Sequence, residues 1–165
     1  MSELLQKARE YEAKMAQCAA GARPTFHVTA PVGWQEWDGI CGRCLDLTVS
    51  FTTTDCDTFR VKLACDGKGR ETLLSLDVKR GILTLDRTYS GMTLDLITER
   101  RMYTDTHSAQ VELRILMDAY SIEVFADGGQ NVMSMVIYTP PEAERIAFSC
   151  EGATEVSVEK YDIKV

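Results

Sequence analysis

The sequence lacks the features that would place it in a membrane, on a secretion route or on nucleic acid. No apolar run approaches the roughly 20 residues that a transmembrane helix requires. The opening MSELLQKAREYEAKMAQ has no apolar core of a signal peptide, so we expect a cytoplasmic protein. The net charge of −7 argues against a nucleic-acid partner, because phosphate binding requires a basic surface. We therefore expect no membrane and no nucleic acid among its partners.

Histidine is nearly absent, which limits metal chemistry. The chain has two histidines, His27 and His107, beside six cysteines. Cys41 and Cys44 have the C-x-x-C spacing of zinc knuckles and redox motifs, but no second ligand pair follows at a suitable spacing. The sequence around them is strand-like, unlike the strand-to-helix turn of a thioredoxin-type motif. We therefore expect reduced thiols, no metal site and no cofactor.

The apolar residues follow two different periods. Residues 3–19 repeat them at helical spacing, which predicts one short N-terminal α-helix that ends before Gly21 and Pro24. From residue 44 the period is two: CLDLTVSF, TFRVKLAC and VELRILM each alternate apolar and polar side chains, as antiparallel strands over a core do. Further strands are predicted at 70–78, 81–86, 120–126, 131–138, 144–150 and 154–164.

Turn signals separate the predicted strands and complete the fold prediction. They are Asp66-Gly67, Arg80-Gly81, Asp127-Gly128-Gly129, Pro140-Pro141 and Glu151-Gly152. Many short strands with close connections predict an all-β fold, an antiparallel β-sandwich of two packed sheets. We place the sandwich at residues 41–165 and the helix with a following arm at residues 1–40.

Three stretches carry a family resemblance. LTLDRTYSG at 83–91 contains an L-D-R strand end followed by S-G. The segment 111–148 contains L-R-I-x-x-D, V-F, an N-D-G-type hairpin and a strand that closes on a tyrosine before Pro140. In this order and spacing they resemble the C-terminal β-sandwich of glycoside hydrolase family 32, the invertases, sucrose-6-phosphate hydrolases, inulinases and levanases. RPTFHVTAPVGW at 23–34 resembles the start of that family's catalytic five-bladed propeller.

The resemblance implies a chain that has the entrance of the propeller and the whole sandwich, but not the catalytic part between them. It assigns the nucleophile to the Asp of N-D-P-N-G, a sugar-binding Asp to R-D-P and the acid/base to the Glu of E-C. Here the chain continues as QEWDG at 35–39, and neither R-D-P nor E-C occurs. Counting without gaps puts Trp37 at the nucleophile position, and a small deletion puts Glu36 or Asp38 near it.

Glu36 and Asp38 are thus the weak catalytic candidates. Retaining glycosidases hold two carboxyl groups about 5 to 5.5 Å apart, whereas residues two apart on a strand are separated by about 6.5 to 7 Å. Asp86, Asp118 and Glu123 match family positions that are not catalytic, and we expect Glu123 on a strand surface in a cross-strand pair. We therefore expect no useful fructosidase activity.

Three functions from different classes stay open. The first is non-catalytic binding of a fructose-containing saccharide, with Trp34 and Trp37 as a stacking platform beside Glu36 and Asp38. Both tryptophans could instead cover an edge of the sandwich or fill a dimer interface. The second is assembly, since the face that a propeller would cover exposes apolar surface and predicts a homodimer, with or without exchanged arms. The third is an active glycosidase of the β-fructofuranosidase type, which hydrolyses O-glycosyl bonds of sucrose or fructans at a site built from the arm, within one chain or across a dimer. We expect a truncated, non-catalytic relative of the β-fructofuranosidases that acts in sugar binding or assembly.

Overall fold

The computed structural model describes residues 25–30, 33–92 and 97–163, and their regular secondary structure consists of strands and one short 3₁₀ turn, η1 (Asp127–Gly129). The helix predicted at 3–19 lies outside the described residues. Among the residues described, no helix is long and apolar enough to cross a bilayer. The strands are β1 (Thr25–Ala30), β2 (Leu45–Thr52), β3 (Cys56–Cys65), β4 (Thr72–Asp77), β5 (Ile82–Asp86), β6 (Glu99–Tyr103), β7 (Gln110–Met117), β8 (Ser121–Ala126), β9 (Asn131–Val136), β10 (Arg145–Gly152) and β11 (Thr154–Asp162).

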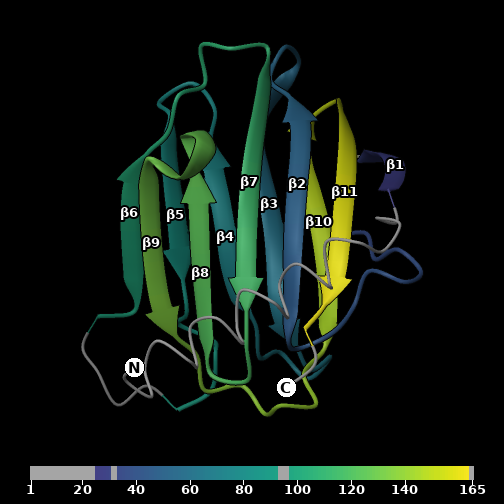
Figure 1. Ribbon diagram of the computed structural model, residues 1–165, viewed down its shortest axis with the longest axis vertical. Helices are drawn as coiled ribbons and strands as arrows, with labels where there is room; N and C mark the ends of the chain where they lie inside the picture. The colour runs from purple at the N-terminus through teal and green to yellow at the C-terminus, as the bar shows by residue number, and fades with distance from the viewer. Residues whose placement is uncertain (1–24, 31–32, 93–96, 164–165) are drawn as a thin grey trace, which may run out of the picture.

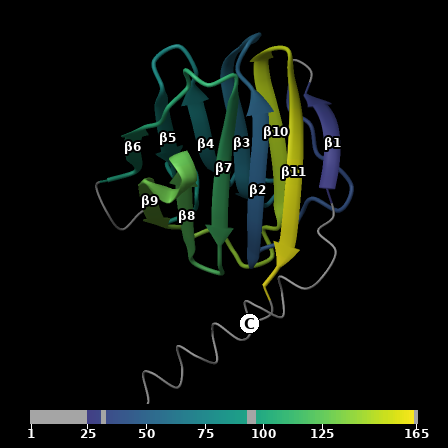
Figure 2. The ribbon, with the colours of Figure 1, turned by 45° about the horizontal axis from the view of Figure 1, so that its top comes forward.

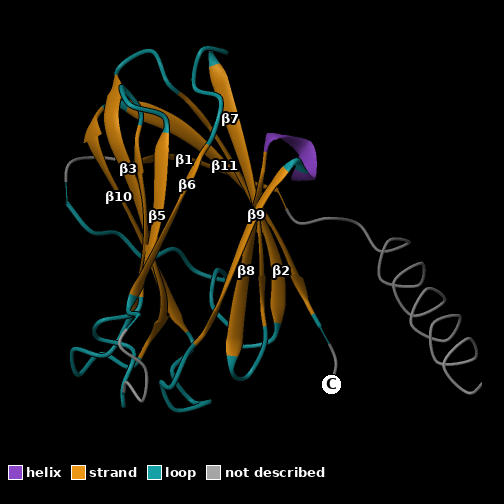
Figure 3. Ribbon diagram, turned by 90° about the vertical axis from the view of Figure 1, so that its left-hand side faces the viewer, coloured by secondary structure: helices purple, strands orange, loops and turns teal. Residues whose placement is uncertain are grey.

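The strands form two antiparallel sheets packed face to face, which confirms the predicted β-sandwich (Figure 1). The six-stranded sheet has the order β1-β11-β2-β7-β8-β9, and the five-stranded sheet has the order β10-β3-β4-β5-β6. Figure 2 shows β1 beside β11 at one edge, and Figure 3 shows the two sheets as separate layers. Parallel pairing is absent from the register of the described strands.

The period of two explains which side of each strand enters the core. In β2, Leu45, Leu47 and Val49 are buried, while the residues between them are partly exposed. Phe51 of the six-stranded sheet stacks on Phe59 of the five-stranded sheet, with ring centroids 4.0 Å apart. Apolar side chains from both sheets therefore form one continuous layer, and its removal from water is the main stabilising contribution to the fold.

Every strand predicted from residue 44 onward is present, but two strands were not predicted. β6 reads ERRMY, and its side chains are mostly exposed. Because it has no regularly buried face, its sequence shows no alternation of apolar and polar residues. Charged side chains on such an edge strand discourage pairing with another chain. β1 lies in the stretch interpreted as an arm, although TFHVTA alternates with period two. The boundary expected at residue 40 stays a prediction; β1 is hydrogen-bonded to β11 as part of the sheet.

The S-G and tyrosine landmarks of the family resemblance meet in the structure. The backbone N–H of Tyr138 donates to the carbonyl of Ser90 at 3.1 Å. The next residue, Gly91, has φ +102°, and a Cβ built on it would lie 2.6 Å from the carbonyl oxygen of Tyr138. Only glycine fits there, because any side chain would overlap the neighbouring backbone.

We predict that Gly91→Ala destabilises the protein far more than Gly69→Ala. Both glycines have φ near +100°, at +102° and +98°, so an alanine would strain the backbone to a similar degree at either position. No heavy atom of the described residues lies within 4 Å of a Cβ at Gly69. We expect a loss of about 1 kcal/mol for Gly69→Ala and about 3 kcal/mol or more for Gly91→Ala, measured by urea unfolding. Equal losses would show that the close approach to Tyr138 is unimportant.

Candidate functional site

Residues 33–42, which we name the edge arm, run along the outer side of strand β10. Gln35 and Phe148 exchange backbone hydrogen bonds of 2.9 and 2.8 Å, and the N–H of Gly42 donates to the carbonyl of Glu144 at 2.9 Å. The other side of β10 pairs with β3. The edge arm therefore occupies backbone groups that an open sheet edge would leave to solvent or to another chain.

Trp37 attaches the edge arm to the core. Its ring stacks on that of Phe148, with centroids 4.3 Å apart and an interplanar angle of 15°. Phe148 is fully buried, Trp37 is half-buried against the core cluster, and Ile40 is buried close by. One face of the Trp37 ring is thus in contact with protein. These are the contacts expected of a tryptophan that covers an edge of the sandwich.

Trp34 lies differently, with 44% of its surface exposed. The ammonium group of Lys62 lies 4.3 Å from the centre of its ring, within the range of a cation–π contact. The same ammonium group forms an ion pair of 2.8 Å with Glu71. Trp34 therefore keeps open aromatic surface beside a charged pair.

Glu36, one of the two weak catalytic candidates, is held by Arg145. The Nε atom of Arg145 lies 3.1 and 3.0 Å from the two carboxylate oxygens, and its Nη2 donates to Oε1 as well. This hydrogen bond raises the pKa of Arg145. An acid/base catalyst needs a carboxyl group that can exchange a proton with a leaving group, whereas both oxygens of Glu36 accept from a guanidinium. The second candidate, Asp38, is exposed.

These charged groups surround one buried thiol. Burial raises the pKa of Cys65 to about 12, and Glu71, Lys62, Glu36 and Arg145 all contribute to its electrostatic environment. The thiol is therefore protonated and unreactive at neutral pH. The common neighbour shows that the two ion pairs lie at one corner of the five-stranded sheet. We name the surface group there the edge patch: Trp34, Glu36, Lys62, Glu71 and Arg145.

We predict that the two tryptophans differ in their contribution to stability. Trp37→Ala removes the stacking on Phe148 and uncovers the core, so we expect a loss of about 2 to 3 kcal/mol in the free energy of unfolding. Trp37→Phe keeps a stacked ring and should lose less than half of that. Trp34→Ala should lose less than about 1 kcal/mol, because the ring is half exposed. Urea unfolding followed by circular dichroism measures all three, and a Trp34→Ala loss as large as that of Trp37→Ala would contradict the assignment.

The remaining cysteines show no metal-binding arrangement in the described part of the chain. Cys56 and Cys150 are buried with their sulfur atoms 3.6 Å apart, and burial raises the pKa of Cys56 to about 12. Cys41 is exposed and Cys44 is half-buried. No group of three or more histidine, cysteine, aspartate or glutamate side chains among the described residues could hold a metal ion.

Two of the three sandwich carboxylates that match family positions accept hydrogen bonds from the backbone in turns. Asp118 accepts from the backbone N–H groups of Tyr120 and Ser121, both at 2.7 Å, in the turn between β7 and β8. Asp86 accepts from the N–H and the hydroxyl of Thr88, at 2.8 and 2.6 Å. Glu123 is exposed on β8. The contacts of Asp118 and Asp86 fit structural roles, and the cross-strand pair expected for Glu123 stays a prediction.

Asp127 joins the two sheets at one end of the sandwich. It lies between β8 and β9, with φ +54°, and accepts hydrogen bonds from the Thr104 hydroxyl at 2.9 Å, the Asp105 N–H at 3.0 Å and the Asn131 amide at 2.6 Å. Thr104 and Asp105 directly follow β6 of the other sheet. Burial alone would raise the pKa of Asp127, but the hydrogen bonds outweigh it and lower the pKa.

This pKa shift predicts a pH-dependent contribution to stability. A carboxyl group whose pKa is lower in the folded state stabilises the fold above its unfolded pKa of about 3.9, and the contribution is lost as the pH falls through the folded pKa. We expect Asp127→Asn to lose about 1 to 2 kcal/mol at pH 7 and progressively less below about pH 4. Urea unfolding between pH 7 and pH 3 tests this, with exposed Glu123→Gln as the control. A loss that stays constant over this range would contradict it.

A comparison with protein families identifies the chain. The model described as "Glycosyl hydrolases family 32 C terminal" matches residues 5–165. The chain therefore belongs to glycoside hydrolase family 32 and carries its C-terminal β-sandwich domain, as the sequence landmarks indicated.

Individual relatives agree with this. A sucrose-6-phosphate hydrolase from Staphylococcus xylosus is 35% identical over 100 residues, which cover 59% of this chain and 20% of that protein. An exo-inulinase structure from Aspergillus awamori superposes with a TM-score of 0.71 at 23% identity, over 87% of this chain and 29% of that one. A galectin structure from Caenorhabditis elegans gives a TM-score of 0.58 at 16% identity, over 82% of this chain and 95% of the galectin. Both structural matches show the fold alone, and the match spans about a fifth of the length of the first relative.

Proposed function

We propose that this chain is a non-catalytic relative of the β-fructofuranosidases that binds a fructose-containing saccharide through the edge patch, within a cytoplasmic system for sucrose or fructans. The observation that carries the proposal is the partly exposed ring of Trp34, which contacts Lys62 of the Lys62–Glu71 ion pair and lies two residues before Glu36, the partner of Arg145. A sugar has apolar C–H faces and polar hydroxyl edges, so an aromatic face beside charged hydrogen-bonding groups suits it.

The family and the edge patch supply different parts of this proposal. The relatives include a sucrose-6-phosphate hydrolase and an exo-inulinase, and sucrose and inulin both contain fructose. The contacts of Glu36 support a binding role over a catalytic one, because its oxygens are taken by Arg145. A binding platform on the protein surface predicts weak affinity, with a Kd of about 1 mM.

We predict that sugar binding depends on Trp34. Isothermal titration calorimetry with fructose, sucrose and short inulins should show millimolar binding to the wild-type protein. Trp34→Ala should weaken it about tenfold or more, since loss of one stacking contact costs about 1.4 kcal/mol. Tyr120→Ala, which removes an exposed aromatic ring elsewhere, is the matched control and should bind as the wild type does. Binding that is absent, or unaffected by Trp34→Ala, would refute the edge patch.

The active-glycosidase alternative has a direct test. We expect no hydrolysis of sucrose, sucrose 6-phosphate or short inulins, because Arg145 holds the carboxylate of Glu36 and Asp38 is exposed, so neither candidate is placed as a paired acid and nucleophile. Turnover that disappears in Glu36→Ala or Asp38→Ala would establish catalysis by the edge arm and overturn the proposal.

Homodimer formation is a second candidate role, favoured by apolar side chains exposed around β9. The backbone carbonyls of Ile97 and Val136 both accept hydrogen bonds from the buried side chain of Arg87, so the two residues lie close together. With Val132, they are about half exposed or more. A second copy of the chain would cover this surface, which water solvates unfavourably. Light scattering should give twice the monomer mass for the wild type and the monomer mass for Val136→Lys; a monomeric wild type would contradict the role.

A further inference from the structure

A large hollow lies at the end of the sandwich that is drawn at the top of Figure 1, where the connections between strands gather. It has a volume of ≈ 720 Å³ and is formed by the β4–β5 turn, the β6–β7 connection and η1 with the residues that follow it. We name it the end cleft. The edge patch, in contrast, lies on the edge arm, β3 and the start of β10. The end cleft is thus a separate surface, and its volume is within the range of about 300 to 1,000 Å³ that is usual for small-molecule sites.

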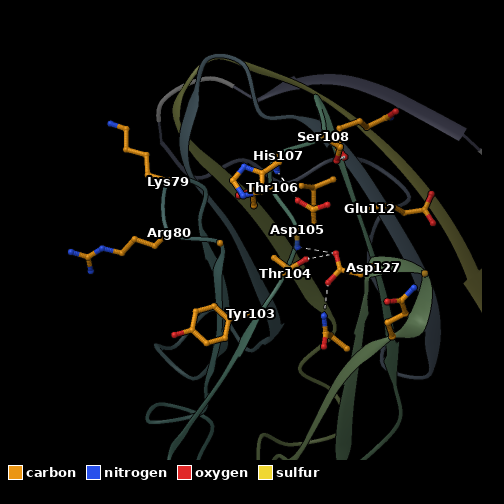
Figure 4. A pocket seen from close by; sticks show the side chains of 16 residues that line it. Lys79, Arg80, Tyr103, Thr104, Asp105, Thr106, His107, Ser108, Glu112 and Asp127 are labelled. Carbon is orange, nitrogen blue, oxygen red and sulfur yellow. Dashed lines mark hydrogen bonds between the residues drawn. The ribbon is translucent and has the colours of Figure 1, made fainter.

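One wall of the end cleft carries an exposed aromatic ring. Tyr103, the last residue of β6, is 75% exposed although it is aromatic. Figure 4 shows Tyr103 and Asp127 on either side of Thr104, with Asp105 above them, and all four residues line the cleft. An exposed aromatic ring contributes little to the stability of the fold. Beside a polar hollow, it offers a surface on which a ligand can stack.

The polar groups of the cleft are held in place by bonds within the protein. Asp127 accepts from Thr104, from the N–H of Asp105 and from Asn131, so the wall that follows β8 is tied to the wall that follows β6. Asp105 in turn accepts from the backbone N–H of His107 at 2.8 Å. A ligand that entered the cleft would meet ordered groups and would lose little free energy in ordering them.

The charge of the cleft indicates the class of ligand. Two of its cationic side chains pair with carboxylates outside the cleft. Lys79 forms an ion pair with Asp57 at 2.8 Å, and Arg80 lies 3.7 Å from Asp77. The lining also contains three carboxylates and three carboxamides: Asp105, Glu112, Asp127, Gln110, Gln130 and Asn131. A phosphate or another anion would need a surplus of positive charge. Carboxylate and carboxamide groups near an aromatic ring can accept and donate hydrogen bonds to hydroxyl groups. Such a lining suits a neutral polyhydroxyl ligand.

We propose that the end cleft is a second saccharide-binding site, in which a sugar ring stacks on Tyr103 and its hydroxyls bond to Asp105 and Asn131. The choice of fructose-containing saccharides rests on the proposed function, but the site does not depend on the edge patch.

Nuclear magnetic resonance separates the two sites, because each reports through its own backbone amides. Titration of the ¹⁵N-labelled full chain with a short inulin-type oligosaccharide should perturb two groups of resonances, one around Trp34 and one around Tyr103, Asp105 and Asn131. Tyr103→Ala should weaken binding at the end cleft about tenfold and leave the affinity at the edge patch unchanged. Tyr103→Phe keeps the ring and should bind within about threefold of the wild type. Trp34→Ala should show the converse selectivity.

The outcomes distinguish this inference from the proposed function. Perturbation at the edge patch alone would overturn the end cleft and leave the proposed function standing. Perturbation at the end cleft alone would support the inference and refute saccharide binding at the edge patch. Perturbation at neither site would overturn both. Inorganic phosphate is the probe for anion binding, and shifts at the end cleft with phosphate but not with the oligosaccharide would overturn the saccharide assignment. Because Tyr103 is largely exposed, Tyr103→Ala should keep the urea midpoint of the wild type, which confirms that it is folded.

Discussion

The burial of one apolar layer between two sheets is the constraint on which the rest of this structure depends. Each strand contributes alternate residues to that layer, and the contact between Phe51 and Phe59 spans it. A layer of this kind is covered by backbone on its two broad faces but stays open at its edges and ends. The edges and ends are therefore where additional segments are required, and where side chains are placed by requirements other than alternation.

The edge arm is one response to this constraint. It extends the five-stranded sheet beyond β10 and places Trp37 on Phe148, so that an open edge of the core is closed. The same placement positions Trp34 and Glu36 on the surface beside Lys62 and Arg145. The stretch that resembles the entrance of a catalytic domain ends at Trp34, so it leads directly into a segment that has a structural role in the sandwich.

The residues that relate the chain to glycoside hydrolase family 32 mainly hold segments of the backbone in place. Arg87 binds backbone carbonyls, Gly91 allows the backbone at Tyr138 to approach, Asp118 closes a hairpin and Asp127 ties one sheet to the other. A buried arginine, a glycine at positive φ and a carboxylate that accepts backbone N–H groups each solve a geometric problem that few other residues solve. This explains why such a motif can identify the fold while giving no information about catalysis. It also explains the end cleft, because Asp127 fixes both of its walls.

The sequence alone determined the β-sandwich, since alternation with one apolar face over strands such as β2, β3 and β7 is compatible with few other arrangements. It also indicated the turns and the family. It did not reveal β6, whose exposed ERRMY carries no period, nor the end cleft, whose residues are distributed from Lys79 to Asn131. Local periodicity reports which side of a strand is buried, whereas the partners of Trp37, Glu36 and Asp127 lie far away in the sequence. Only the tertiary structure decided those contacts, because they depend on which edges and ends the two sheets bring together.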